Sequence, residues 1–193
     1  MYKHFLKRFF DIFVSFLALP FIFLVVIIMA PIIYINDPGP IFYNAPRVGK
    51  NGKVFKMFKL RSMYVNSPDI RNADGSTYNS ANDPRVTKVG KIMRKTSIDE
   101  LPQLLNVFLG HMSLIGPRPS TPKILEGMTP LQAERLKVRP GITGLWQVSG
   151  RSDTDYARRV ALDSYYVLNW SPWMDIWIFL RTICAVLLMR GAR

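Results

Sequence analysis

An aspartate and a glutamate stand side by side in Thr96-Ser-Ile-Asp-Glu-Leu-Pro-Gln103, where a helix is expected to begin. Ser97 and Glu100 match the Ser-x-x-Glu capping box, but Pro102 favours a start nearer Asp99, because its missing N–H is harmless only in a first turn. Either start places both carboxylates beside the positive end of the helix dipole. Acidic residues are favoured there for structural reasons alone. The functional interpretation is an ionised carboxylate that acts as a nucleophile or holds a divalent cation.

Arginines in rigid turns give this carboxylate pair a chemical context. Arg118 lies between two prolines in Gly116-Pro-Arg-Pro119, so its backbone is fixed before a ligand arrives. The segments Arg139-Pro-Gly-Ile-Thr-Gly144 and Ser149-Gly-Arg151 allow turns that expose backbone N–H groups, which commonly cradle phosphate oxygens. Planar bidentate arginines suit the same ligand. A solvated surface explains one isolated arginine, but it explains poorly several arginines in Pro/Gly turns beside two carboxylates.

The composition limits the classes of protein that these residues can belong to. The chain has 193 residues, of which 49% are hydrophobic and 20% charged, and its formal net charge is +13. High hydrophobicity excludes a disordered chain, and the length suits one domain, alone or with a membrane element. The single cysteine, Cys184, excludes an internal disulfide framework and a Cys-based zinc cluster. The positive charge indicates an anionic partner: nucleic acid, an acidic membrane surface or phosphorylated substrates.

A long apolar segment runs from Ile12 to Ile35 without a charged residue. As a straight helix it would extend about 36 Å, enough for a hydrocarbon core of about 30 Å, and it is too long for a signal peptide. Pro20 divides it, which predicts a kink or break. Basic residues flank it on both sides, and positive flanks favour the cytoplasmic face. Two interpretations remain open: a re-entrant helix–break–helix over residues 1–36, or a kinked single span.

Tryptophans mark a second membrane-like segment near the C-terminus. Trp170, Trp173 and Trp177 follow the i, i+3, i+7 spacing of one helix face, and charged residues such as Asp175 and Arg181 interrupt the segment too often for a span. This favours an amphipathic helix at the level of the lipid headgroups. The alternative is a core helix that packs its tryptophans inward.

The middle of the chain reads as a hairpin followed by helices. Residues 37–61 predict a turn and a β-hairpin, with a strand at Ile41-Phe-Tyr43 and the Asn-Gly turn signal in Lys50-Asn-Gly-Lys53. Residues 64–84 predict a polar loop, and residues 85–110 predict two helical pieces, the second ending at Gly110. The expected fold class is α+β and mostly helical, with a catalytic domain over residues 37–193 that carries interfacial amphipathic helices.

Three long motifs resemble the bacterial sugar transferases, or monotopic phosphoglycosyl transferases. They are Arg94-Lys-Thr-Ser-Ile-Asp-Glu-Leu-Pro-Gln-Leu-Leu-Asn106, Met112-Ser-Leu-Ile-Gly-Pro-Arg-Pro119 and Val138-Arg-Pro-Gly-Ile-Thr-Gly-Leu-Trp-Gln-Val-Ser-Gly-Arg151. Lys59-Leu-Arg-Ser-Met63 and Asn169-Trp-Ser-Pro-Trp-Met-Asp175 also fit. The resemblance covers nearly the whole chain.

The resemblance implies an enzyme that moves a sugar-1-phosphate from a UDP-sugar to undecaprenyl phosphate, with release of UMP, and so begins a membrane glycan pathway. It implies Mg²⁺ as cofactor and a covalent phosphosugar–aspartate intermediate. The expected location is the cytoplasmic face of the bacterial inner membrane, as a monotopic protein. Expected partners are membrane lipids, and either other glycan-assembly enzymes or further copies of the chain, but not nucleic acid.

The resemblance also assigns residues. Asp99 is the expected nucleophile and Glu100 its partner, both near the metal. The expected phosphate-binding residues are Lys59, Arg94, Arg118 and Arg151. Further expected supporting residues are Arg61, Arg139, Asp163 and Asp175. The family's re-entrant helix is broken at a proline, which matches Pro20.

The chain departs from the family pattern at several positions. The break is Leu19-Pro20 instead of Ser-Pro, His111 replaces a common acid in Gly110-His-Met-Ser113, and Ala45-Pro-Arg47 replaces Gln-x-Arg. We expect His111 to be structural. Larger relatives carry transmembrane helices before the catalytic part, so this chain looks like the minimal catalytic unit. Residues 64–84 and 120–135 are where we expect sugar selectivity to reside.

Two other functions stay open from the sequence. The first is a basic membrane-surface binding protein without catalysis, which would explain the net charge but not the carboxylate pair and the arginine turns. The second is a glycosyltransferase that moves the sugar without its phosphate and releases UDP.

Overall fold

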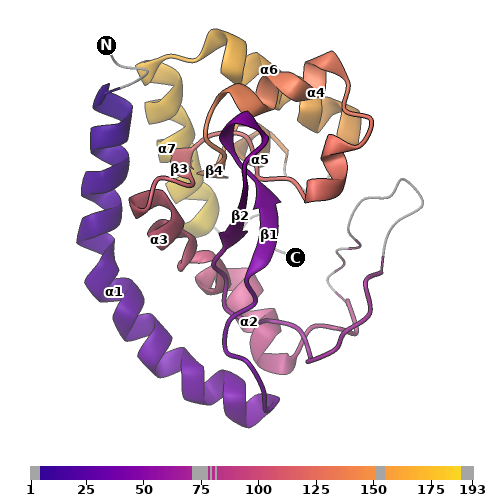
Figure 1. Cartoon of the computed structure of the whole chain (residues 1–193). Coiled ribbons are helices and arrows are strands. Elements are labelled where there is room, and N and C mark those ends of the chain that lie inside the picture. Colours follow the sequence, from indigo (N-terminus) through magenta and orange to yellow (C-terminus); the bar gives the residue numbers. More distant parts are fainter. Residues whose placement is uncertain (1–4, 71–77, 79, 81, 151–154, 188–193) are drawn as a thin grey trace.

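The computed structural model describes residues 5–70, 78, 80, 82–150 and 155–187. Most of these residues are helical, around two small two-stranded sheets, as expected for an α+β fold (Figure 1). The helices are α1 (Lys7–Asn36), α2 (Lys88–Thr96), α3 (Gln103–Phe108), α4 (Pro130–Glu134), α5 (Leu145–Val148), α6 (Tyr156–Asn169) and α7 (Pro172–Leu187). The strands are β1 (Ala45–Val48), β2 (Val54–Met57), β3 (Ser113–Ile115) and β4 (Gly141–Thr143).

The apolar segment forms one continuous helix, α1, which passes through both Pro20 and Pro31. The predicted break at Pro20 is therefore wrong. A proline removes one backbone hydrogen bond, which bends a helix without ending it when the turns on either side continue. Figure 1 shows α1 bowed along one side of the molecule, with α3 against its inner side. Helix α1 is long and apolar enough to cross a membrane, and only 11% of its most apolar stretch is buried, unlike the core helix of a soluble protein.

Charged side chains fasten the first turns of α1 to the rest of the molecule. Lys7 Nζ lies 2.7 Å from Asp175 Oδ2 on α7. Arg8 donates to two backbone carbonyls at the end of α3, at 2.6 and 2.9 Å. Asp11 is 3% exposed, and its Oδ1 accepts hydrogen bonds from the Ser113 hydroxyl and from the next backbone N–H on β3. A buried carboxylate of this kind is stable only with such donors, so this end of α1 has a fixed place.

The far end of α1 packs against the same body through apolar contacts. Ile33 is 3% exposed and forms a small core with Leu60 and Met93 of α2. Asn36 accepts a hydrogen bond from the backbone N–H of Val89. Both ends of the apolar helix are therefore held on one globular part, while the side chains between them are largely exposed.

The predicted hairpin is confirmed, with its strands shifted along the chain. β1 and β2 pair antiparallel, with Ala45 opposite Met57 and Val48 opposite Val54. Between them, Asn51 (φ 57°) and Gly52 (φ 77°) adopt left-handed conformations, as the Asn-Gly signal predicts. The strand predicted at residues 41–43 is reduced to a single bridge from Phe42 to Leu60.

The short parallel pair β3–β4 brings the two Gly/Pro motifs together. Ser113 pairs with Gly141 and Ile115 with Thr143. Gly116 N–H donates to the Thr143 carbonyl, and Gly141 N–H to the Pro117 carbonyl, each at 2.9 Å. A Cβ on Gly141 would lie 2.1 Å from the Gly116 nitrogen, so this approach requires glycine. The N–H of Gly141 is therefore engaged in this pairing and is not available to a phosphate.

The C-terminal helices place their tryptophans differently from either sequence-based interpretation. Trp170 ends α6 and lies near Tyr166, so the three tryptophans do not share one helix. On α7, Trp173 is 78% exposed and Trp177 is also exposed, while Ile178 is fully buried. The alternative in which the tryptophans pack inward is therefore wrong for the two on α7.

Candidate active site

The carboxylate pair lies in a tight turn between two helices. Asp99 and Glu100 belong to the 3-10 turn Ile98–Glu100, which links α2 to α3. Ser97 adopts a left-handed conformation (φ 59°) and ends α2, and its side chain makes no capping bond. The predicted capping box is therefore absent, because a left-handed residue cannot aim its hydroxyl along the next helix. Pro102 stands just before α3, where a missing N–H costs nothing.

Lys59 approaches the pair from the strand side of the molecule. The backbone N–H of Leu60 donates to the Asp99 carbonyl at 3.0 Å, which fixes this segment beside the turn. Lys59 Nζ then lies 2.9 Å from Asp99 Oδ2 and 3.2 Å from Glu100 Oε1. One ammonium group thus contacts both carboxylates.

Asn106 holds this segment in place and is a residue that the sequence reasoning missed. It is fully buried on α3, accepts from the Phe58 N–H and donates to the Lys56 carbonyl, each at 2.8 Å. Two amides, Gln103 and Asn106, interrupt the otherwise apolar α3, and a buried amide in such a helix is the signal that indicates such a clamp. His111 lies beside it and stacks on Phe55, which agrees with the structural role expected for this histidine.

Arg118 completes the charged cluster from a third direction. It follows β3 in the Gly-Pro-Arg-Pro turn, and its Nη2 donates to Glu100 Oε1 at 3.0 Å. The same Glu100 oxygen also contacts Lys59. Four predicted site residues from three distant segments therefore meet at one place: Lys59, Arg118 and the carboxylate pair.

The two carboxylates differ in their electrostatic surroundings. Asp99 is 1% exposed; burial raises its pKa, and the charge of Lys59 only partly offsets this effect. Burial also opposes ionisation of Glu100, but Arg118 and Lys59 outweigh it and hold the pKa of Glu100 well below its usual range. Glu100 is thus a permanent anion between two cations. Asp99 is the more basic carboxylate, and the more basic of two similar anions is the better nucleophile.

Arg94 lies on α2, close to the pair. Its Nε donates to the Ser62 hydroxyl at 3.1 Å, and burial lowers its pKa while the charges of Asp99 and Asp83 act in the opposite direction. The contact depends on close packing, because a Cβ on Gly90 would lie 1.9 Å from the Ser62 carbonyl oxygen. The structure thus places Arg94 against Ser62, near enough to Asp99 for the two charges to interact.

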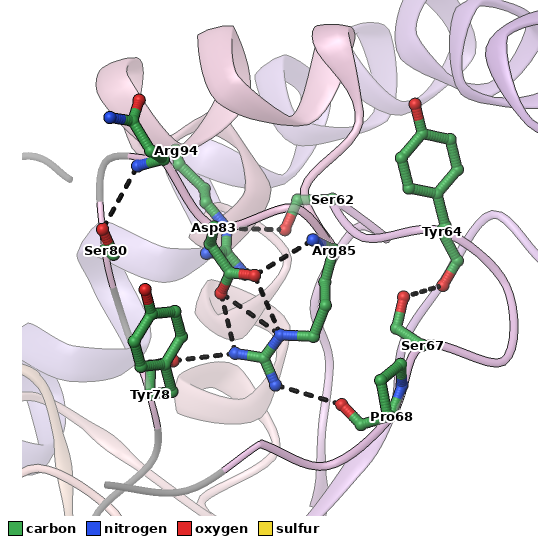
Figure 2. Close-up of polar contacts among 10 residues, drawn as sticks. Ser62, Tyr64, Ser67, Pro68, Tyr78, Ser80, Asp83, Arg85 and Arg94 are labelled. Carbon is green, nitrogen blue, oxygen red and sulfur yellow. Dashed lines mark hydrogen bonds and ion pairs between the residues drawn. The ribbon is translucent and has the colours of Figure 1, made fainter.

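A buried ion pair fastens the described part of the polar loop near Arg94. Arg85 Nη2 lies 2.7 Å from Asp83 Oδ2, and the guanidinium also donates to the carbonyls of Pro68 and Tyr78. Figure 2 shows this pair beside Ser62 and Arg94. The segment in which we expect sugar selectivity is thus tied to the site at its C-terminal end.

The other predicted residues contact different parts of the fold. Arg61 pairs with Asp37, and Arg139 donates to the Gly110 carbonyl at 2.8 Å. Asp175 pairs with Lys7 of α1, and Asp163 pairs with Arg135 at 2.9 Å. These are the four residues expected to support the site. Arg151 lies outside the described residues.

The carboxylate pair can contribute two ligands to a metal ion. Among the described residues there is no group of three or more His, Cys, Asp or Glu side chains that can hold one. Mg²⁺ commonly binds through one or two carboxylates together with substrate phosphates. Asp99 Oδ2 is buried and contacts the Lys59 ammonium at 2.9 Å, so a metal ion would bind this oxygen beside that ammonium or in its place. The two carboxylates therefore fit a magnesium ion whose remaining ligands include the oxygens of a diphosphate.

The family model "Bacterial sugar transferase" matches residues 2–189 of the chain. The chain belongs to the bacterial sugar transferase family. The shared segment includes the carboxylate pair, Lys59 and Arg118, and it confirms the resemblance found in the sequence.

Individual bacterial sugar transferases are similar over almost all of this chain. It is 43% identical to the exopolysaccharide production protein ExoY of Sinorhizobium fredii, over 96% of this chain and 87% of that protein. It is 44% identical to the undecaprenyl-phosphate galactose phosphotransferase of Salmonella typhimurium, over 98% of this chain and 42% of that protein. It is also 44% identical to the galactosyl transferase CpsE of Streptococcus agalactiae, over 100% of this chain and 44% of that protein. The chain thus spans less than half the length of two of these curated relatives.

Proposed function

We propose that this chain transfers a sugar-1-phosphate from a UDP-sugar to undecaprenyl phosphate, releases UMP and begins the assembly of a membrane glycan such as an exopolysaccharide, capsule, O-antigen or glycoprotein glycan. The observation that carries the proposal is the contact of Asp99 and Glu100 with Lys59 and Arg118 at one place. Reaction between two anionic substrates requires concentrated positive charge beside a nucleophile. The name of the Salmonella relative, an undecaprenyl-phosphate galactose phosphotransferase, supports the same reaction.

In the first half-reaction, a carboxylate oxygen of Asp99 attacks the phosphorus that bears the sugar. A new P–O bond forms to Asp99, the P–O bond to UMP breaks, and UMP leaves with the bonding electrons. Lys59 contacts Asp99 directly, so it must transfer its contact from the carboxylate to an incoming phosphate oxygen. Arg118 and Arg94 stabilise the remaining negative charge of the diphosphate.

In the second half-reaction, an oxygen of undecaprenyl phosphate attacks the same phosphorus. The P–O bond to Asp99 breaks, and the carboxylate is restored. Because UMP leaves first, the two anionic substrates do not occupy the charged cluster together. Glu100 stays ionised throughout, since Arg118 and Lys59 hold it in that form, and it keeps Arg118 aimed at the site.

We propose that Asp99 and Glu100 hold Mg²⁺. When bound, the ion neutralises charge on the diphosphate and favours departure of UMP.

We further propose that the protein is monotopic, with both ends of α1 on the cytoplasmic side. The support is that Lys7 and Ile33, near opposite ends of α1, both pack on the same body, while most of the apolar surface between them is exposed. Exposed Trp173 and Trp177 on α7 suit the headgroup region. Single cysteines placed at Lys3 and at Lys50, after replacement of Cys184, should be labelled from the same side of sealed vesicles. Labelling from opposite sides would contradict the topology.

The nucleotide product tests the reaction. The chain in detergent or nanodiscs is mixed with Mg²⁺, a polyprenyl phosphate and each of a panel of UDP-sugars, and the nucleotides are separated. UMP release that depends on one UDP-sugar is expected. Release of UDP would favour a glycosyltransferase, and the absence of both nucleotides with every sugar would favour the non-catalytic binding protein.

A further inference from the structure

Arg135 contacts the backbone of Arg118, the residue whose side chain reaches the carboxylate pair. It lies in the 3-10 turn Arg135–Lys137 after α4, and its Nη2 donates to the backbone carbonyl of Arg118 at 3.0 Å. The side chain of Arg118 in turn donates to Glu100. Arg135 therefore contacts the backbone of Arg118, whereas Glu100 contacts its side chain.

Asp163 holds Arg135 from α6. Its carboxylate is 1% exposed, and Oδ2 lies 2.9 Å from Arg135 Nη2. The Arg118 carbonyl and the Asp163 carboxylate thus share one guanidinium nitrogen. A buried carboxylate is costly without a cation, so Asp163 requires Arg135 to stay in this position.

The contact between Arg135 and the Arg118 carbonyl matters because the Arg118 side chain is 40% exposed and has several rotatable bonds. Backbone hydrogen bonds hold the loop on either side of Arg118, from Gly141 to the Pro117 carbonyl and from Val48 to the Ser120 carbonyl, each at 2.9 Å. The charge-assisted hydrogen bond from Arg135 adds a constraint at the Arg118 carbonyl itself. Arg118 and Arg135 also line the same narrow crevice, beside Gln132.

We propose that Arg135, held by Asp163, is a positioning residue that keeps Arg118 aimed at the diphosphate of the nucleotide sugar. The inference rests on the proposed function, because it requires that Arg118 bind phosphate. It gives Asp163 a role through Arg135 and Arg118 in place of direct contact with the substrate. It also adds Arg135 to the residues on which substrate affinity depends.

The competing explanation is that Arg135 and Asp163 only fasten α6 to the neighbouring turn. That explanation predicts a loss of thermal stability and an equal effect on activity whether or not Arg118 is present. Positioning predicts an effect that passes through Arg118, and so disappears when the Arg118 side chain is removed.

The test is a double-mutant cycle on UMP release against UDP-sugar concentration. Arg135→Gln and Asp163→Asn are made in the wild type and in Arg118→Ala, and Lys137→Gln is the matched control, because it breaks an exposed ion pair with Glu134 in the same turn. We expect Arg135→Gln to raise KM about tenfold in the wild type and less than about twofold in Arg118→Ala. Asp163→Asn should follow Arg135→Gln, and Lys137→Gln should match the wild type.

The outcomes separate the inference from the function beneath it. If the wild type releases no UMP, the proposed function fails. If Arg118→Ala is impaired but Arg135→Gln raises KM equally in both backgrounds, only the positioning role is wrong. If Arg135→Gln unfolds, Arg135→Lys, which keeps a cation beside Asp163, takes its place in the cycle. An unchanged KM for a folded Asp163→Asn variant would also overturn the inference.

Discussion

Lys59 Nζ lies 2.9 Å from Asp99 Oδ2, and the same ammonium also contacts Glu100. This lysine is the only described cation in ion-pair contact with both carboxylates. It therefore has two effects: it favours the ionised form of Asp99 against burial, and it stands where a substrate phosphate must arrive.

Replacing Lys59 by Met should lower the rate of UMP release by about 100-fold or more, the usual cost of losing one preorganised donor to a developing anion. The matched control is Lys56→Met, an exposed lysine on the preceding strand, which should leave the rate unchanged. Equal rates of UMP release in both variants would show that Lys59 does not take part in the reaction.

Gly90→Ala tests the packing that places Arg94. Alanine normally stabilises a helix interior relative to glycine by about 1 kcal/mol, yet here its Cβ would lie 1.9 Å from the Ser62 carbonyl oxygen. We expect a net loss of about 1–3 kcal/mol in the free energy of unfolding, measured with denaturant in detergent. Lys91→Ala, at an exposed position on the same helix, is the control. A more stable Gly90→Ala protein would show that α2 does not pack this closely.

The sequence predicted the parts of the fold that depend on local chemistry. Asn51-Gly52 gives the hairpin because both residues tolerate left-handed torsions, and Pro102 marks the start of α3 because it has no N–H. The break at Pro20 was predicted wrongly, since one lost hydrogen bond does not end a helix whose two ends are docked. Ser97 fits the capping pattern, but it ends α2 in a left-handed conformation and its side chain makes no capping bond, which the local pattern does not report.

The site was predictable as a set of residue types more than as a set of contacts. Asp99 and Glu100 can be recognised from their dipeptide, and Arg118 from its Pro-bounded turn. Lys59 and Arg61 cannot be told apart in this way, because they are two residues apart in the chain and only the tertiary fold distinguishes their roles. Lys59 contacts the carboxylate pair, and Arg61 binds Asp37. Arg135 carries no sequence signal, because its partner Asp163 is on a different helix.

Asp175→Asn tests whether this acid belongs to the fold or to the chemistry. Asp175 is bound by Lys7, the Tyr166 hydroxyl and the Trp170 N–H, so we expect a loss of about 3 kcal/mol in the free energy of unfolding, typical of a broken buried pair. The folded fraction should still form the covalent adduct from UDP-sugar. Glu126→Gln, at an exposed position, is the control. A stable Asp175→Asn protein without adduct would place Asp175 in the reaction.

The pH dependence of the first half-reaction tests the link through Asp163. Burial raises the pKa of Asp163 to about 7, although Arg135 and, at longer range, Arg118 favour its ionised form. Below this pKa the carboxyl takes up a proton and loses its attraction for Arg135, so adduct formation at low UDP-sugar should slow as pH falls from about 8 to about 6. Omitting the lipid removes its titrating phosphate. In Asp163→Asn, the rate of adduct formation should be low and should not change over this pH range. An unchanged inflection in the pH profile of that variant would assign the inflection to another group.

The covalent role of Asp99 is tested most directly by the mass of the protein itself. Wild type, Asp99→Asn and Glu100→Gln are incubated with UDP-sugar and Mg²⁺ without lipid, the intact mass is measured, and the modified peptide is mapped. We expect a phosphosugar adduct on Asp99 in the wild type, none in Asp99→Asn, and a reduced amount in Glu100→Gln, since Glu100 only orients Arg118 and the metal. An adduct on Glu100, full adduct formation by Asp99→Asn, or no adduct in an active wild type would contradict the account.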